Sequence, residues 1–560
     1  MTEIRTLPHA VATDGTRDCR PVLHYTAADT WLNDPNGLVY DDGTYHLFYQ
    51  NNPFANVWGN MSWGHATSTD LLAWTEHAVA IPCDDLEDVF SGSIVVDHLN
   101  TSGLGSAQSP PWVAVYTSAF KDASPHSGTQ AQSLAYSTDS GMTWTKFGAN
   151  PVLTRNSANF RDPKVFWHSG PGDSGPDVAG ADGGYWVMVA VEAHACQVLF
   201  YRSPNLREWK LLSEFGPANA IGGEWECPDL FPLPLDGDPE KIRWVLTVNI
   251  NPGAVAGGSG GQYFIGDFDG VRFIPDVSPA VNAARSQSGT AAEPPGTEAR
   301  QSAEILKSFQ WLDWGRDYYA AVSFTNAPDN RRIMIGWMNN WDYANQIPTW
   351  PWRSPMSLAR EVSLAIVGGQ PALIQNPVLP ATALPAPFFE ISEPTGITNS
   401  TLDIPAGRSE AALIIRAEFG SVTAERFGFV LGAGAAGHDG GTEIYYEAST
   451  GELVVDRTRS GNRDFHPLFA SVDRCPVALQ DSALKLEIVV DRCSVEVFAQ
   501  GGQACITDLV FPAGSGSPAA FGQLSAFAEG GNVTVRKLAV TAVTAVSAQS
   551  QAVQAVTPWA

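Results

Sequence analysis

The chain has few cationic side chains for its 560 residues. Lys and Arg together number 33 against 59 Asp and Glu, which gives a formal net charge of −26 at pH 7. Most of such a surface repels a phosphate backbone and an anionic lipid headgroup. We therefore expect no nucleic-acid partner and no membrane partner, whereas a neutral ligand is indifferent to the sign of this charge.

Cysteine is also sparse and follows no metal-binding pattern. The seven cysteines are scattered, their number is odd, and no two are spaced as CxxC. Neither a zinc site nor a redox motif is indicated. We therefore expect no metal and no cofactor, and a reducing compartment is the simpler setting for these thiols.

Long apolar segments are missing from the sequence. No stretch approaches the ~18 apolar residues of a membrane span. The first residues, MTEIRTLPHAVATDG, contain no apolar run of signal-peptide length. The sequence as written therefore predicts a cytoplasmic protein. The alternative is a secreted protein whose leader has been removed.

Amphipathic helical patterns are scarce, and short β-type runs take their place. Runs rich in Val, Ile and aromatic residues, bounded by Gly, Pro, Asn and Asp, occur at residues 45–50, 112–118, 186–191, 244–248 and 332–337. Many short strands at regular spacing indicate an all-β sandwich, barrel or propeller. A β-rich run followed by a Ser-containing turn and Trp recurs at residues 66–74, 135–144 and 201–209. This repeat favours successive blades of a propeller.

Changes in composition divide the chain into segments. We expect an N-terminal extension at residues 1–17 and the propeller domain at residues 18–366. The Pro-rich residues 367–387 are a natural linker. Residues 388–540 alternate like a β-sandwich, and the Ala/Val/Gln-rich residues 541–560 form a loosely held tail. Stretches rich in Gly, Pro and Ser predict surface loops at residues 169–184, 253–261 and 276–301.

Aromatic residues, by contrast, are abundant, with 18 Trp, 14 Tyr and 26 Phe. Flat aromatic faces pack against the C–H faces of sugar rings, so this richness fits a protein that acts on carbohydrate. Large β proteins also use aromatics for packing alone, and composition leaves both explanations open. Cleavage of a glycosidic bond needs two carboxyl groups that flank it. Three carboxylates in ordered surroundings are candidates.

The first candidate is Asp34, within the sequence WLNDPNG. Pro35 biases Asp34 away from helical geometry, and Trp31 supplies an apolar wall. Asn33 and Asn36 offer neutral hydrogen bonds, which keep a carboxylate ionised as a nucleophile requires. A plain Asp-Pro-Asn-Gly turn explains the same residues without chemistry.

The second candidate is Asp162, within FRDPKV. Arg161 and Lys164 flank it, so we expect a low pKa and a permanent charge on this carboxyl. Such a group can bind sugar hydroxyls and stabilise positive charge without moving protons. A surface turn of charged residues is the competing explanation.

The third candidate is Glu226, within EWECPDLF. Trp225 and Cys227 give it an apolar setting, and Glu224 and Asp229 are neighbouring acids. Burial beside other acids favours the protonated carboxyl that a general acid needs near neutrality. A solvated acidic turn is the alternative.

Taken together, these segments resemble glycoside hydrolase family 32, the family of invertases, inulinases and levanases. The resemblance covers roughly residues 18–540. WLNDPNG is similar to the family's nucleophile motif, RDP (161–163) to its second acidic motif, and ECPD (226–229) to its acid/base motif. Further similar segments are FSGS (90–93), WGNMSWGH (58–65), DYYA (317–320), GWM (336–338), WRSPMSL (352–358) and VEVF (495–498). Chance does not explain so many similar motifs in one sequence.

The resemblance implies a five-bladed β-propeller followed by a β-sandwich. It implies a retaining, exo-acting β-fructosidase that acts on levan, inulin or sucrose, with bacterial levanases and exo-inulinases most similar. Asp34 would be the nucleophile, Glu226 the general acid/base and Asp162 the transition-state stabiliser. Further positions that match the family's fructosyl pocket are Asn33, Gln50, Trp58, Phe90, Ser91, Arg161 and Trp337. The sequence departs from the family in a long insertion at residues 276–301 and in Tyr318, where Phe is frequent.

Three other functions stay open on the sequence alone. A transferase of the same family would pass fructose to a sugar and make longer oligosaccharides. A non-catalytic carbohydrate-binding protein would most simply have lost one of the three carboxylates, and all three are present. A propeller that serves as an interaction scaffold is the third. The sequence gives no order of preference among levan, inulin and sucrose as substrates. It gives no oligomeric state either.

Overall fold

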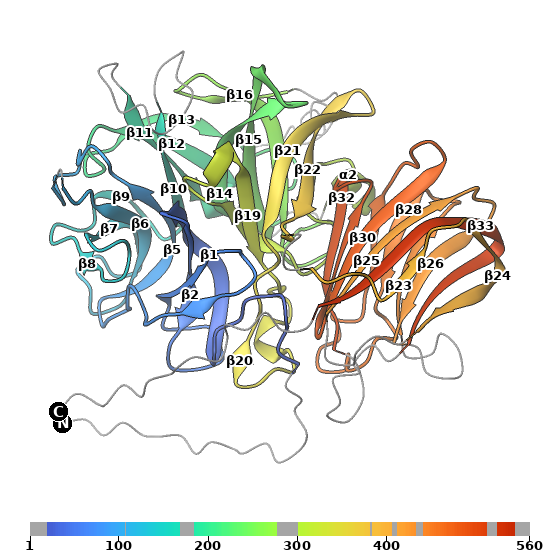
Figure 1. Cartoon of the computed structure of the whole chain (residues 1–560). Helices are drawn as coiled ribbons and strands as arrows, with labels where there is room; N and C mark the ends of the chain where they lie inside the picture. Colours follow the sequence, from blue (N-terminus) through green and yellow to red (C-terminus); the bar gives the residue numbers. More distant parts are fainter. Residues whose placement is uncertain are drawn as a thin grey trace.

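Two β-rich bodies make up the chain, one coloured blue to yellow and one coloured orange to red (Figure 1). The computed structural model describes residues 19–106, 108–168, 184–276, 301–380, 384–405, 412–432, 441–511 and 523–543. The predicted extension at 1–17, nearly all of the predicted loops at 169–184 and 276–301, and the chain after Val543 lie outside the described residues. The described helices are short: α2 (Ala303–Lys307) and the 3-10 turns η1 (Ala193–Ala195), η2 (Pro328–Asn330) and η3 (Ala344–Gln346).

The first body consists, within the described residues, of five antiparallel blades. Blade I contains β1 (Thr30–Asp41), β2 (Thr44–Asn52), β3 (Ser62–Ser68) and β4 (Thr75–Glu76). Blade II contains β5 (Glu87–Val96), β6 (Trp112–Phe120), β7 (Gln130–Ser137), β8 (Thr145–Lys146) and β9 (Leu153–Ser157). Blade III contains β10 (Phe160–His168), β11 (Tyr185–Glu192), β12 (Gln197–Ser203) and β13 (Lys210–Phe215).

The last two blades share one continuous sheet. Blade IV contains β14 (Glu224–Leu235), β15 (Asp238–Asn251), β16 (Gly260–Phe268) and β17 (Phe273–Pro275). Blade V contains β18 (Tyr319–Ser323), β19 (Arg332–Trp337), β21 (Arg360–Val367) and β22 (Gln370–Pro377). A single parallel pairing, Leu235 with Leu364, joins the two blades.

The first strand of every blade faces the centre, and these five strands form a closed ring. In order around the ring, β1 contacts β5, β5 contacts β10, β10 contacts β14, β14 contacts β18, and β18 contacts β1. The short strand β20 (Trp352–Arg353) pairs with the start of β1 and ties the last blade to the first. The predicted five-bladed propeller is confirmed.

Apolar side chains explain why the blades stack. A buried cluster fills each space between neighbouring blades, such as the one that contains Phe48, Trp63 and Trp112 between blades I and II. The space between blades V and I holds another cluster, which includes Trp31 and Trp337. Burial of such large side chains supplies about 1.5–3 kcal/mol each for residues of Leu or Phe size. The strands therefore hold together as a ring and not as separate sheets.

The predicted repeat of a turn ending in Trp has a structural cause. The indole N–H of Trp74 donates to Leu71 O at 3.2 Å, that of Trp144 to Gly141 O at 2.9 Å, and that of Trp209 to Leu206 O at 2.9 Å (blades I, II and III, respectively). Each bond closes the turn after the third strand of its blade. The repeat thus marks three successive copies of one supersecondary unit.

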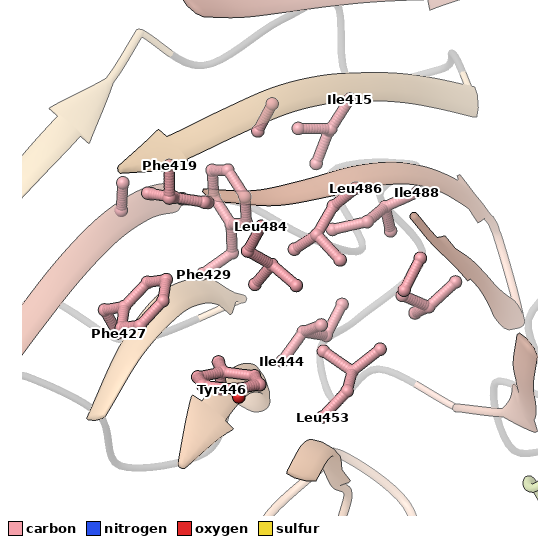
Figure 2. Close-up of a cluster of buried hydrophobic side chains, with 14 of the residues drawn as sticks. Ile415, Phe419, Phe427, Phe429, Ile444, Tyr446, Leu453, Leu484, Leu486 and Ile488 are labelled. Carbon is pink, nitrogen blue, oxygen red and sulfur yellow. The ribbon is translucent and has the colours of Figure 1, made fainter. Parts of the chain in front are cut away.

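The second body is a β-sandwich. Its described strands are β23 (Phe389–Ile391), β24 (Thr395–Ile404), β25 (Ala412–Gly420), β26 (Arg426–Leu431), β27 (Thr442–Glu447), β28 (Glu452–Asp456), β29 (Val472–Pro476), β30 (Ala483–Asp491), β31 (Ser494–Ala499), β32 (Ala504–Leu509) and β33 (Leu524–Val543). The long strand β33 pairs with β23, β24, β25 and β26. Inward side chains such as Phe419, Phe429 and Ile488 fill its core (Figure 2).

Two predicted segment borders differ from the structure. Residues 370–377 fall in the predicted linker but form β22, which pairs with β21 along its whole length. Pro371 and Pro377 end up at the two ends of this strand, where proline is tolerated. Likewise, residues 541–543 of the predicted tail belong to β33 and pair with β25.

A buried charge cluster joins the first described segment to both bodies. His24 pairs through Nδ1 with Asp491 and through Nε2 with Glu496, both at 2.8 Å. Glu496 also accepts from Arg360 Nη2 of blade V at 2.7 Å. Burial lowers the pKa of His24, but the two carboxylates outweigh burial and raise it to about 9. His24 is therefore protonated in the folded protein and forms ion pairs with two carboxylates of the sandwich, those of Asp491 and Glu496.

We expect His24→Gln to lower the melting temperature most at pH 6.5 and below. The folded-state pKa of His24, about 9, lies above its ordinary value of 6.5. The stabilisation is therefore complete below pH 6.5 and is lost as the pH rises through about 9. Melting curves of both proteins from pH 6 to 10 measure the difference. A difference that does not change with pH would show that His24 contributes packing alone.

Candidate active site

The predicted site residues gather where the innermost strands are irregular. Register shifts fall between Leu32 and Pro35 in β1, Phe90 and Gly92 in β5, Arg161 and Lys164 in β10, Glu226 and Asp229 in β14, and Tyr319 and Val322 in β18. A bulge adds a residue to one strand and re-aims the side chains beside it. Three bulge residues have positive φ angles, Asp162 (61°), Cys227 (43°) and Ala320 (53°). This conformation is rare outside glycine and is typical of functional sites.

Neutral donors hold Asp34, but only one of the two predicted asparagines is among them, because Asn36 Nδ2 donates to the backbone oxygen of Asp34 at 3.1 Å. Asn33 Nδ2 donates to Oδ1 at 3.0 Å, and Ser91 Oγ donates to Oδ2 at 2.7 Å. Trp31 Nε1 in turn fixes Asn33 through its side-chain oxygen at 2.7 Å. Burial and the charge of Glu226 raise the pKa of Asp34, and the bonds from Ser91 and Asn33 oppose this rise. Asp34 and Glu226 therefore lie close enough to repel each other.

Asp162 lies on β10 and belongs to the same cluster, but its predicted low pKa is wrong. Burial raises the pKa of this carboxyl above its ordinary value, although the Arg161 guanidinium opposes the shift. Lys164 does not help, because its Nζ lies 3.1 Å from Asp229 and donates to Ser323 O. Sequence neighbours across a bulge can point to different sides, and here one of the two expected cations is directed elsewhere.

Glu226 is surrounded differently from the apolar setting that the sequence predicts. Arg161 Nη2 donates to Oε1 at 2.9 Å, and the Tyr319 hydroxyl donates to Oε2. Asp229 is not beside it, since its Oδ2 accepts from both the backbone and the hydroxyl of Ser323 at 2.7 Å. Glu226 is therefore a half-buried acid held between a cation and a phenol.

Cys227 links two of the carboxylates. Its backbone N–H donates to Asp162 Oδ2 at 2.9 Å, and its thiol lies 3.5 Å from Asp34 Oδ2. Burial and the three surrounding carboxylates raise the pKa of this thiol well above its ordinary value. The thiol therefore stays protonated and acts as a weak hydrogen-bond donor between Asp34 and Asp162.

The remaining predicted pocket residues lie around this cluster at different depths. Gln50 is buried and donates to Val89 O at 3.0 Å, next to Phe90. The ring of Trp58 is 46% exposed and lies 6.1 Å from that of Phe90 in an edge-on contact. Trp337 is fully buried and packs against Trp31 at 5.9 Å. The predicted pocket residues thus include one exposed indole, Trp58, and one fully buried indole, Trp337.

Three further residues belong to the cluster, and of these the sequence indicates only Glu224, as an acidic neighbour of Glu226. Tyr319 reaches Glu226 from blade V, and its motif DYYA was noticed only as a blade signature. Glu224 shares the Arg161 guanidinium with Glu226, and His194 on η1 bonds to Glu224. The alternation of a strand was the available signal for Glu224, since residues two apart face the same side.

The cluster has an excess of negative charge. Three carboxyl groups, those of Asp162, Glu224 and Glu226, lie against the guanidinium of Arg161, and a fourth, that of Asp34, lies near Glu226. Such a site stabilises positive charge that develops on a bound ligand. Among the described residues, no group of three or more His, Cys, Asp or Glu side chains could hold a metal ion. In the same residues, no helix is both long and apolar enough to cross a membrane.

Asp34 and Glu226, brought together by the innermost strands of a propeller that also carries an exposed indole, meet the two-carboxylate requirement of a glycoside hydrolase. The model of the glycosyl hydrolases family 32 N-terminal domain matches residues 24–377, and that of the family 32 C-terminal domain matches residues 390–542. The chain therefore belongs to glycosyl hydrolase family 32.

Characterised relatives and a solved structure agree with this membership. A levanase of Bacillus subtilis is 40% identical over 530 residues, which cover 93% of this chain and 70% of the relative. An extracellular exo-inulinase of Aspergillus niger is 39% identical over 521 residues, with 88% and 89% covered. The crystal structure of the exo-inulinase of Aspergillus awamori superposes with a TM-score of 0.82 at 36% identity and covers 95% of this chain and 99% of that one.

Proposed function

We propose that the protein is a retaining, exo-acting β-fructosidase that releases terminal fructose from fructans, with sucrose as a further substrate. One observation supports the chemistry best. Asp34, Asp162 and Glu226 come from three different blades and meet around one thiol, with Asp34 held by neutral donors and Glu226 held by Arg161 and Tyr319. The levanase and exo-inulinase relatives supply the substrate class.

In the first step, the Asp34 carboxylate attacks C2, the anomeric carbon of the terminal fructosyl ring. The bond from C2 to the glycosidic oxygen breaks, and the Glu226 carboxyl gives its proton to that oxygen, so the leaving sugar departs as an alcohol. In the second step, the Glu226 carboxylate takes a proton from water, and the water oxygen attacks C2. The bond to Asp34 breaks, and fructose leaves with its original configuration.

The other residues would bind and orient the fructosyl unit. Asp162 would accept hydrogen bonds from its hydroxyls and, when ionised, stabilise the positive charge that develops on the ring. Arg161 would hold Glu226 toward the leaving oxygen. Asn33 and Ser91 orient Asp34, and Gln50, Phe90 and Trp337 would shape the pocket. The exposed ring of Trp58 would pack against a sugar face at the entrance.

We expect fructose to be the first soluble product from levan and inulin, and to appear from sucrose as well. The proposed pocket residues would enclose one terminal fructosyl unit and admit only the end of a chain, so the polymer should shorten one unit at a time. Chromatography of the products in the first minutes, with Asp34→Asn protein as the blank, measures this. An early ladder of oligosaccharides would indicate attack within the chain, and products longer than the substrate would indicate transfer.

For cellular location, the cytoplasm stays the prediction and export the alternative. The exo-inulinase relative is named extracellular, which is the observation in support of the alternative. Separate assays of fructose release in the medium and in lysed cells of the source organism distinguish the two.

A further inference from the structure

The proposed general acid has an unfavourable neighbour. Arg161 Nη2 lies 2.9 Å from Glu226 Oε1. A cation at this distance favours the carboxylate, because the attraction disappears when the acid holds its proton. An acid that must protonate the leaving oxygen near neutrality therefore needs something that limits the influence of Arg161.

Glu224 is placed to do this. Residues 224 and 226 are two apart on β14 and face the same side of the strand. The same guanidinium nitrogen, Arg161 Nη2, donates to Glu224 Oε2 and to Glu226 Oε1. Nη2 carries two N–H groups, so each acid accepts one of them, and the two acids share a single positive charge.

Glu224 is itself fixed and charged. His194 Nε2, on the turn η1 of blade III, bonds to its other oxygen, Oε1. Burial raises the pKa of Glu224, but Arg161 and His194 outweigh burial and hold the pKa below its ordinary value. The side chain is 39% exposed, so the carboxylate keeps contact with solvent at the edge of the site. It is thus a stable anion at the pH of catalysis.

We propose that Glu224 is a positioning residue that takes part of the Arg161 interaction away from Glu226 and so keeps Glu226 able to donate its proton. This inference rests on the proposed function, in which Glu226 is the acid. The charged and titratable groups around the pair come from every innermost strand that contacts it: Asp34 on β1, Arg161 and Asp162 on β10, Cys227 on β14, and Tyr319 on β18. Of the two acids, Glu224 is the one to which His194 bonds.

Two effects of removing the charge of Glu224 have the same sign. Arg161 is released to interact with Glu226 alone, and a negative charge close to Glu226 disappears. Both make the Glu226 carboxylate easier to form. The alkaline limb of the pH profile of kcat/KM, which reports loss of the catalytic proton, must then move to lower pH.

The first test compares Glu224→Gln with the wild type on sucrose. We expect the alkaline limb to move down by about 1 pH unit, the lower end of what one charge at contact distance does. Glu224→Asp keeps the charge and should restore most of the shift. The matched control is Glu214→Gln, on the outer strand β13 of the adjacent blade, which should leave the limb in place. A limb that stays unchanged or moves up in Glu224→Gln would overturn the proposal.

A second readout separates this proposal from the function on which it rests. Protein labelled with ¹³C at the glutamate carboxyl carbon is titrated by NMR, and the signal lost in Glu226→Gln identifies Glu226. Its titration midpoint should fall in Glu224→Gln and stay put in Glu214→Gln, without any substrate present. If wild-type protein released no fructose, the proposed function would fail. The NMR titration would still show whether Glu224 weakens the effect of Arg161 on Glu226. A Glu226 midpoint that does not fall in Glu224→Gln would refute the proposed role of Glu224.

Discussion

Replacement of Asp34 by Asn is expected to lower kcat by on the order of 10⁴-fold or more, as removal of a nucleophile does in other covalent mechanisms. The amide has nearly the same shape and keeps an oxygen for the Ser91 hydroxyl, which donates to Asp34 at 2.7 Å. It cannot form a stable bond to the anomeric carbon. Steady-state rates on sucrose and on inulin measure the loss.

Folding should survive this change and provides its control. Burial and Glu226 raise the pKa of Asp34, which means that the folded protein holds this anion at a cost. A neutral amide removes the repulsion, so we expect a melting temperature equal to or above that of the wild type. Turnover near the wild-type rate in a variant with an unchanged circular dichroism spectrum would exclude Asp34 as the nucleophile.

The second large effect is expected for Glu226→Gln, and its size should depend on the leaving group. General acid catalysis contributes about 10²–10⁴-fold. For sucrose, whose leaving sugar needs a proton, we expect the full loss. For an aryl β-fructofuranoside with a nitrophenolate leaving group, the first step needs no proton, so the loss in kcat/KM, which reports that step, should be far smaller.

The same variant also tests the second step. Without the Glu226 base, water attacks the fructosyl-enzyme slowly, whereas azide needs no base. Added azide should therefore restore turnover of the aryl substrate in Glu226→Gln and yield a fructosyl azide. Asp34→Asn is the matched control, because azide should not restore its retaining reaction. An equal loss on both substrates, without rescue, would assign Glu226 a structural role.

The sequence predicted the parts of this protein that depend on local patterns. Short strands, the turn repeat that ends at Trp74, Trp144 and Trp209, and the motifs around Asp34, Asp162 and Glu226 can all be recognised within about ten residues. The Pro-rich stretch misplaced a border because proline also fits the ends of an edge strand, as Pro371 and Pro377 do in β22.

Contacts between blades could not be predicted from local patterns, because they join residues that are far apart in the sequence. Tyr319 and Glu226 are 93 residues apart, and the packing of blade V against blade IV brings them together. The pKa of Asp162 was misjudged for the same reason. Its neighbour Lys164 pairs with Asp229 on another blade, and burial with nearby carboxylates then dominates. The charges around a carboxyl depend on which side chains lie next to it. In this site the bulges of the innermost strands set the direction of those side chains.

The most direct test of the central claim is the configuration of the product at the anomeric carbon. With methanol present as an acceptor, wild-type protein should convert sucrose to methyl fructoside, and carbon-13 NMR distinguishes the two anomers. Attack by Asp34 followed by attack of methanol inverts C2 twice, so the account predicts methyl β-fructoside as the first product. Methyl α-fructoside as the first product would show a single inversion and would contradict a fructosyl-enzyme formed on Asp34.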